Sequence, residues 1–256
     1  MQDPEIERIG DEEMELIWRF TDEDVARVRT VVEAQSESAF VQLRIRRNVE
    51  QPPVSMTLEA FWEEMVNCIL TTQQKSGPDA PINRLANVQP YPLGYARYRE
   101  VADARVFATA VLTEFGGIRF INRIPDYLAR NFAALEAGLW ERTLPVIEAL
   151  IVDRSPVSER AAATFLDKEY IGLGPKQARN VLQGLGLARY EIPIDSRVAG
   201  WLNENGFPWN LTSTPLADRA TYEFVLDGVQ MLCAQAGILP CVFDAAVFAS
   251  KDSKAQ

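Results

Sequence analysis

The chain has 256 residues, of which 47% are hydrophobic and 24% are charged, and its formal net charge is −10. This is the composition of a globular protein with one large domain or two small ones, and it argues against disordered, collagen-like and disulfide-rich classes. The absence of histidine excludes Ser-His-Asp triads and His-ligated metals. The three cysteines are too few and too scattered for a zinc site or an iron–sulfur cluster, so we expect no metal.

No apolar run reaches the roughly 18 residues that a membrane span needs, and the acidic N-terminus has no apolar signal segment. We therefore expect a cytoplasmic protein with no membrane partner. Residues 1–40 carry 12 acidic and 4 basic side chains, which leaves the other residues close to neutral. The net charge thus does not exclude a local basic surface that binds nucleic acid.

Residues 1–20 are expected to form a mobile acidic segment. Thr21 and Asp24 resemble a capping box that begins a helix ending near Gln35. The stretch 39–49 partly alternates between apolar and polar residues, which predicts one short strand, and the prolines of 51–55 predict a break. These patterns divide the chain into residues 1–50, an acidic segment with one helix and a short β element, and residues 51–256, a helical core.

The strongest helical pattern runs from Leu58 to Leu70, where apolar residues recur at i, i+3, i+4, i+7 and i+8. Short loops with Gly or Pro separate further predicted helices at about 103–115, 125–137, 141–152, 158–168, 175–184, 195–205, 215–236 and 241–250. The predicted fold class is therefore mainly α.

Three features between residues 165 and 202 carry chemistry. Gly172 and Gly174 allow a tight turn whose N–H groups can bind a phosphate, although an ordinary turn between two helices has the same residues. Lys176 follows in the first helical turn, where the helix dipole disfavours a protonated amine, so it is either a nucleophile or a solvated surface lysine. Asp195 opens the next helix as an N-cap, or as a carboxylate that stabilises positive charge on a sugar.

Together these residues resemble the helix-hairpin-helix–Gly/Pro/Asp superfamily of DNA glycosylases, and most closely its 8-oxoguanine DNA glycosylase/AP lyase branch. The family pattern is a turn of Gly, an apolar residue and Gly, then a lysine at the start of the second helix. An aspartate that ends an apolar-Pro-apolar segment follows 19 residues after the lysine. Here GLGPK supplies Lys176 and IPID supplies Asp195. The resemblance covers roughly residues 57–250 and implies two helical lobes around a cleft with a helix-hairpin-helix motif.

The resemblance also implies roles for other residues. Lys176 and Asp195 would be catalytic, and a monovalent cation can bind at the hairpin. The residues expected to contact DNA are Gly172, Gly174, Gln73, Gln74, Arg179 and Arg197. Outside the resemblance, the charges of Arg44, Arg46 and Arg47 on the predicted strand make them candidate phosphate contacts. Many family members have His at the position of Arg197, and the eukaryotic 8-oxoguanine enzymes have Cys at that of Asn180. Asn180 and Phe243 are expected to line the base pocket.

The function implied is that of a monomeric enzyme that excises a modified base, most readily 8-oxoguanine, from double-stranded DNA without a cofactor. A Schiff base formed by Lys176 would add AP lyase activity. Three alternatives stay open: a glycosylase for another modified base, such as a hypermodified phage base in antiviral defence; a non-catalytic helix-hairpin-helix DNA-binding protein; and an acidic protein with a purely structural role.

Overall fold

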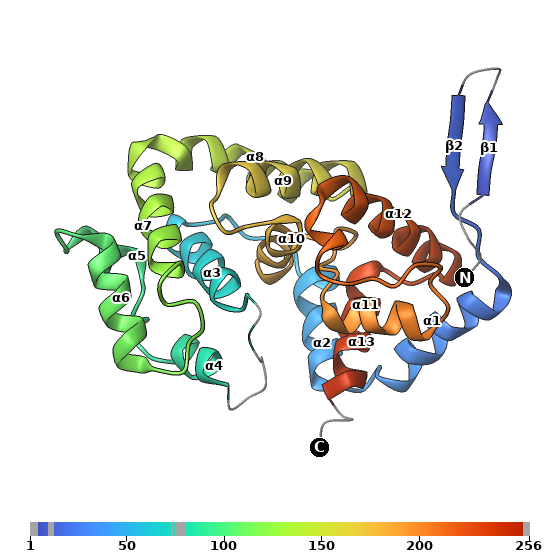
Figure 1. The fold of residues 1–256 in the computed structure, drawn as a ribbon, viewed down its shortest axis with the longest axis horizontal. Coiled ribbons are helices and arrows are strands. Elements are labelled where there is room, and N and C mark those ends of the chain that lie inside the picture. The colour runs from blue at the N-terminus through green and yellow to red at the C-terminus, as the bar shows by residue number, and fades with distance from the viewer. Residues whose placement is uncertain (1–4, 10–12, 73, 75–79, 253–256) are drawn as a thin grey trace. The chain divides into compact units, whose positions relative to one another are not determined.

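The computed structural model describes residues 5–9, 13–72, 74 and 80–252. The chain is mainly helical, as predicted (Figure 1). It divides into two compact units: unit 1 contains residues 1–51 and 189–256, and unit 2 contains residues 52–188. The predicted break at 51–55 therefore falls at a unit boundary, but residues 1–51 fold together with residues 189–256 instead of forming a segment of their own.

Unit 1 surrounds a core of buried apolar side chains. Its elements are β1 (Glu5–Ile9), β2 (Glu13–Ile17), α1 (Asp22–Ala34), α2 (Ala39–Arg44), the π-helical η1 (Ile45–Glu50), α11 (Ser196–Glu204), the short 3-10 turn η3 (Pro215–Ala217), α12 (Arg219–Ala236) and α13 (Pro240–Asp252). The capping box of α1 is confirmed: the Thr21 hydroxyl accepts from the Asp24 N–H, and the Asp24 carboxylate accepts from the Thr21 N–H.

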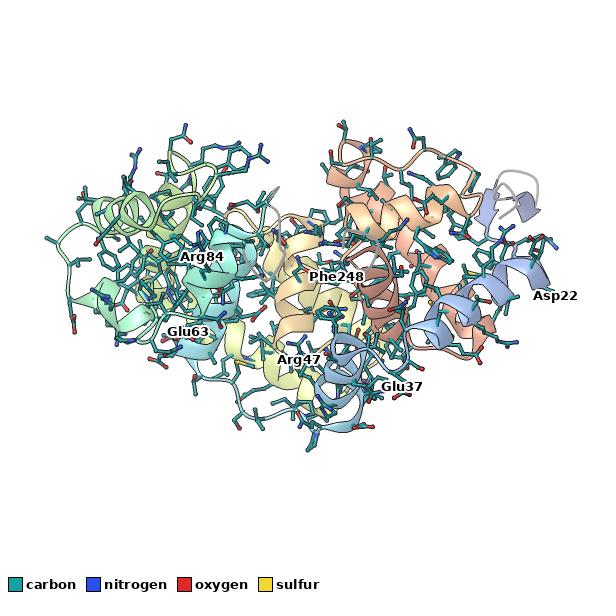
Figure 2. The ribbon with its side chains drawn as sticks, turned by 90° about the horizontal axis from the view of Figure 1, so that it is seen from below. Asp22, Glu37, Arg47, Glu63, Arg84 and Phe248 are labelled. Carbon is teal, nitrogen blue, oxygen red and sulfur yellow. The ribbon has the colours of Figure 1, made fainter. Side chains whose placement is uncertain are left out.

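The strand predicted at 39–49 is wrong, because these residues form α2 and η1 (Figure 2 labels Arg47 on η1). Ser38 caps α2 by accepting from the Val41 N–H, which starts a helix where the alternation suggested a strand. Val41, Arg44 and Asn48 are all buried, at spacings of three and four residues. Burial of these three residues on one helical face therefore favours a helix over the strand that the partial apolar–polar alternation predicted.

The β element lies earlier than predicted, inside the segment expected to be a mobile lead-in. β1 and β2 pair antiparallel, with Ile6 opposite Leu16. Trp18 directly follows β2 and is only 4% exposed; its indole N–H donates to the Phe224 carbonyl at 3.0 Å. Gly228 of α12 leaves the space that this indole fills, since a Cβ there would lie 2.7 Å from the ring. The end of the acidic segment is thus part of the unit 1 core.

No single helix in the described part of the chain is long and apolar enough to cross a membrane. The pair α12 and α13, bent by 97°, meets that test only when taken together, by length and composition.

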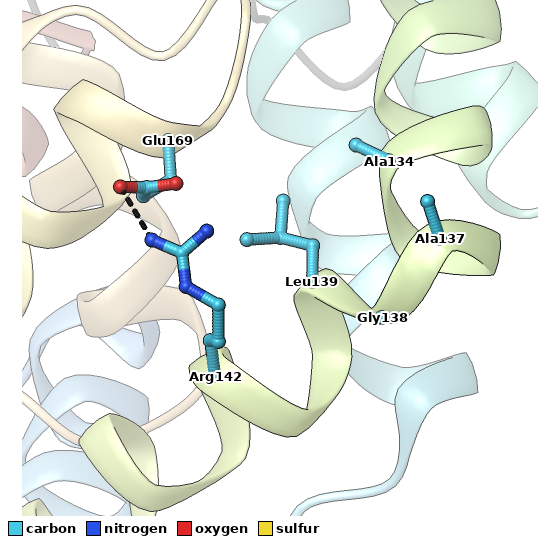
Figure 3. A pocket seen from close by; sticks show the side chains of 6 residues that line it. All are labelled: Ala134, Ala137, Gly138, Leu139, Arg142 and Glu169. Atoms are coloured by element: carbon cyan, nitrogen blue, oxygen red, sulfur yellow. Dashed lines mark ion pairs between the residues drawn. The ribbon is translucent and has the colours of Figure 1, made fainter.

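Unit 2 is all helical in the described residues. Its elements are α3 (Leu58–Leu70), α4 (Pro81–Ala86), α5 (Tyr95–Arg99), α6 (Ala104–Phe115), α7 (Ile124–Ala134), the π-helical η2 (Leu135–Leu139), α8 (Trp140–Val152), α9 (Pro156–Glu169) and α10 (Pro175–Gly184). Gly138, with a φ of +99°, kinks the run from α7 through η2 to α8. A pocket of about 270 Å³ opens beside this kink and is lined by Ala134, Ala137, Gly138, Leu139, Arg142 and Glu169 (Figure 3).

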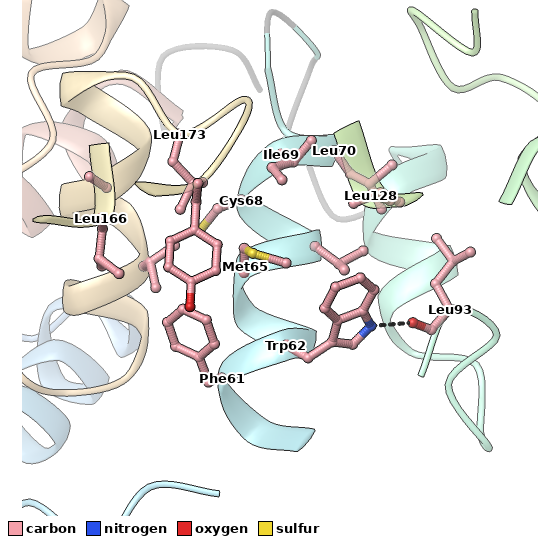
Figure 4. Packing of buried hydrophobic residues seen from close by; sticks show 14 of the residues in the cluster. Phe61, Trp62, Met65, Cys68, Ile69, Leu70, Leu93, Leu128, Leu166 and Leu173 are labelled. Atoms are coloured by element: carbon pink, nitrogen blue, oxygen red, sulfur yellow. Dashed lines mark hydrogen bonds between the residues drawn. The ribbon is translucent and has the colours of Figure 1, made fainter. Parts of the chain in front are cut away.

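The amphipathic pattern of residues 58–70 is confirmed in α3, which supplies the centre of the unit 2 core (Figure 4). Phe61, Trp62 and Met65 are fully buried. The Trp62 indole N–H donates to the Leu93 carbonyl at 2.7 Å, so the one polar atom of this side chain is satisfied inside the core. The helix ends at Leu70, and this end carries the candidate site.

Candidate functional site

The loop between α9 and α10 is a tight turn that only glycine can make at its first position. Gly172 has a φ of +87°, and a Cβ there would lie 2.9 Å from Cδ2 of Tyr127. Asn131 of α7 holds the residue before it: the side-chain amide donates to the Ile171 carbonyl, and the side-chain oxygen accepts from the Ile171 N–H, both at 2.9 Å. Leu173 is buried and anchors the turn to the core (Figure 4).

The N-terminus of α10 is open on its outer side. Gly174 is the exposed N-cap residue, it makes no side-chain cap, and an added Cβ would meet nothing within 4 Å. Pro175 occupies the first helical position, where it has no N–H to satisfy. The first-turn N–H groups and the positive end of the helix dipole are thus available to an anion.

Lys176 lies in this first turn and is half-buried. Within the ranges that the structure describes, its side chain makes no hydrogen bond or ion pair. The lysine therefore lies in the first turn of an uncapped helix N-terminus, with no carboxylate partner among the described residues.

The first turn of α10 is fixed to the end of α3 by a buried side chain that the sequence analysis missed. The Gln177 amide donates to the Cys68 carbonyl at 2.6 Å and to the Thr72 hydroxyl at 3.0 Å. The Asn180 amide in turn donates to the Gln177 side-chain oxygen at 2.6 Å. Asn180 therefore supports Gln177, and its expected contact with a flipped base stays a prediction.

A pocket of about 240 Å³ lies beside the turn, within unit 2. Its lining residues are Ile69, Thr72, Phe120, Arg123, Ile124, Tyr127, Gly172 and Gly174. Arg123 is exposed, and its guanidinium lies 4.4 Å from the centroid of the Phe120 ring. The pocket thus combines both glycines of the turn with an arginine and two aromatic rings. No local signal marked Arg123, because only the packing of α7 against α3 and the turn brings it there.

Only one of the two glutamines expected to contact DNA after α3 lies in the described part of the chain. Gln73 lies outside the described residues. The Gln74 amide donates to the Leu70 carbonyl, and its side-chain oxygen accepts from the Arg119 N–H at 3.2 Å. In this conformation Gln74 caps the end of α3, and its expected contact with DNA stays a prediction.

Three residues expected at the functional surface are buried instead. Arg179 is only 1% exposed, because α10 is buried on nearly all sides. Its guanidinium donates to the Pro175 carbonyl at 2.9 Å. Phe243 is fully buried against Trp201, with ring centroids 5.0 Å apart. Arg44 is 7% exposed and pairs with Asp244 at 2.7 Å. The exposure expected of these three residues is therefore not observed, and the phosphate contacts of Arg179 and Arg44 and the base-pocket wall at Phe243 stay predictions.

Asp195 belongs to unit 1, where it caps α11. Its Oδ1 accepts from the Arg197 and Val198 N–H groups at 2.8 and 3.0 Å, which confirms the N-cap. Its Oδ2 lies 3.3 Å from Nη1 of Arg197, and the two side chains are 18% and 23% exposed. The Asp195 side chain is thus partly exposed, and a role in charge stabilisation is compatible with its role as the cap.

The second pocket, the cysteines and the acidic side chains give weaker indications of a functional site. The pocket at Gly138 contains the Arg142–Glu169 ion pair at 2.9 Å, whose arginine is 61% exposed. All three cysteines are buried and outside any disulfide, and burial raises the pKa of the Cys233 thiol, which disfavours the reactive thiolate. In the described residues no group of three or more Cys, Asp or Glu side chains could hold a metal.

No protein-family model matches this chain, and no curated protein matches it significantly. The likeness to the glycosylase superfamily therefore rests on the residues themselves.

We expect Gly172→Ala to destabilise the protein by about 1–3 kcal/mol, because alanine is strained at positive φ and its Cβ would meet Tyr127. Gly174→Ala is the matched control: its φ is −73° and its surroundings are open, so only the weaker N-cap preference is lost, below about 1 kcal/mol. Urea unfolding of both variants measures the difference. Equal losses would show that the turn does not need glycine at 172.

Proposed function

We propose that the protein is a DNA glycosylase with AP lyase activity, in which the loop from α9 to α10 is the helix-hairpin-helix element of a fold with two helical lobes around a cleft. One observation carries the proposal: Lys176 has no ion-pair partner among the residues that the structure describes, and it lies at an uncapped helix N-terminus. It directly follows the Gly172–Gly174 turn, whose two glycines line a pocket together with Arg123. That arrangement combines an anion site with a nucleophile. It favours a phosphodiester substrate over a purely structural role.

The chemistry would proceed through the lysine amine. Its lone pair forms a bond to C1′ of the sugar while the C1′–N bond to the base breaks, and the base leaves with that electron pair. Asp195 stabilises the positive charge that develops on the sugar. The nitrogen lone pair then expels O4′ from C1′, which opens the sugar ring to a Schiff base, and the two amine protons end on the departing base and on O4′. Loss of a C2′ proton from the Schiff base then expels the 3′-phosphate, and this β-elimination cuts the strand. The base must be flipped out of the duplex before the reaction.

The substrate class we favour is 8-oxoguanine in double-stranded DNA, excised by a cytoplasmic monomer without a cofactor, with a monovalent cation as an optional ligand of the turn. A second candidate is a glycosylase for another modified base, including a hypermodified phage base. The polar groups around the turn favour it: Thr72 and Arg123 line the pocket, and Asn180 stands one turn after Lys176. Amide and guanidinium groups can hydrogen-bond an added substituent.

An excision assay over several duplexes separates these candidates. The substrates are 8-oxoguanine opposite cytosine, an alkylated purine, and DNA with glucosylated hydroxymethylcytosine, and mass spectrometry identifies the released base. We expect release of 8-oxoguanine and strand cutting. Release of only another base would favour the second candidate. Retention on DNA at low salt without release would indicate a binding protein, and no retention would indicate a structural one.

A further inference from the structure

A series of contacts in unit 1 begins at the catalytic candidate Asp195. Backbone N–H groups hold its Oδ1, and the Arg197 guanidinium lies 3.3 Å from its Oδ2. The same guanidinium lies over the Phe248 ring of α13, 4.1 Å from the centroid. Arg197 therefore contacts the carboxylate through one nitrogen while its guanidinium carbon lies over the aromatic ring, and the compact ammonium of a lysine is less suited to both contacts.

The aromatic face that holds Arg197 is itself fixed by α2. The Phe248 and Phe40 rings stack with centroids 4.4 Å apart and planes inclined by 19°. Arg44 lies 5.5 Å from the Phe40 centroid, and its ion pair with Asp244 is buried at 2.7 Å. Figure 2 shows Phe248 on α13. The stack thus links α2, α13 and α11, which come from distant parts of the sequence.

We propose that Arg197 is a positioning residue for Asp195, and that the Phe248–Phe40 stack holds Arg197 in place. The inference rests on the proposed function, in which the Asp195 carboxylate faces the sugar. With both oxygens held, the carboxylate cannot rotate away from one orientation, and such preorganisation is what charge stabilisation needs. It also gives the N-terminal helix α2 a part in catalysis, although α2 contributes no reacting group.

The proposal differs in its consequences from the phosphate contact expected of Arg197. A phosphate contact would affect DNA affinity, because it acts in the bound ground state. A positioning residue would affect the rate constant of base release and leave affinity unchanged, because the carboxylate acts on charge that develops in the transition state.

The test is a single-turnover assay with protein in excess, combined with DNA affinity and thermal unfolding of each variant. We expect Arg197→Lys and Phe248→Leu to lower the excision rate constant by about 10- to 100-fold with unchanged Kd. Phe248→Tyr keeps the ring and should retain the wild-type rate. Phe224→Leu is the control for lost aromatic packing, since Phe224 packs on Trp18 in the same unit; it should lower Tm and leave the rate constant unchanged.

Two results would overturn the inference while the proposed function stands. The first is wild-type excision by Phe248→Leu. The second is a loss confined to Kd, which would make Arg197 a DNA contact. Failure of the proposed function has a different signature: the wild-type protein then releases no base from any duplex, and the inference fails with it.

Discussion

Substitution of Lys176 by glutamine is expected to abolish trapping of the protein on DNA by borohydride. Borohydride reduces the imine between a lysine amine and C1′ to a stable amine, and the glutamine amide cannot form that imine. Excision should fall by about three orders of magnitude or more, since the nucleophile is lost. The measurements are a gel that resolves the covalent protein–DNA adduct and single-turnover release of the base.

Lys168→Gln is the matched control for this experiment. Lys168 is exposed in the last turn of α9, on the other side of the same turn and in the same unit. The substitution removes an equal charge, so it should change DNA affinity through electrostatics alone and leave trapping intact. Trapping of the Lys176 variant at the wild-type level would identify another amine as the nucleophile. Base release without trapping in the wild type would indicate a monofunctional enzyme.

The second large effect is expected at Asp195. Asn is as good an N-cap as Asp, so Asp195→Asn should preserve α11 and the free energy of unfolding while removing the negative charge. If that charge stabilises the transition state, kcat should fall by about two to three orders of magnitude with DNA affinity nearly unchanged. Measurements of turnover, Kd and Tm on one preparation distinguish a catalytic role of the Asp195 charge from its structural role as the N-cap.

Two companion variants complete the comparison. Asp195→Ala removes both the charge and the cap, and should add a stability loss of about 1 kcal/mol. Asp218→Asn makes the same chemical change at the N-cap of α12. There the Thr221 backbone N–H and the Thr221 hydroxyl both donate to the carboxylate, and these hydrogen bonds hold the pKa of Asp218 below its usual range. It should keep full activity. If Asp195→Asn is also fully active, Asp195 is a cap and nothing more.

Signals that act within one helical turn were readable from the sequence. The capping pair of Thr21 and Asp24, the apolar stripe of residues 58–70 and the N-cap at Asp195 each depend on atoms three or four residues apart. Gly172 belongs with them, since its lack of a Cβ permits the positive φ of the turn. Such features need no knowledge of distant packing, so the elements that position Lys176 could be predicted.

Burial of polar and aromatic side chains was decided by the tertiary structure. In sequence, Arg44 and Arg179 look like surface cations, yet both are buried, Arg44 in an ion pair with a residue 200 positions away. Arg123 gave no signal and lines the pocket beside the turn. Whether an arginine is buried or exposed depends on which helices pack over it, and those helices come from distant parts of the sequence.

The sequence by itself determined the helical class, the turn that presents Lys176 and the helix that Asp195 begins, because backbone geometry and capping are settled among near neighbours. Only the tertiary structure decided that residues 39–50 are helical. Their alternation is partial, and burial of Val41 and Asn48 on one face within unit 1 favours the helix. The packing of α2, α11 and α13 likewise decided that Arg197 lies against Phe248, because stacking energy is gained only once these distant segments meet.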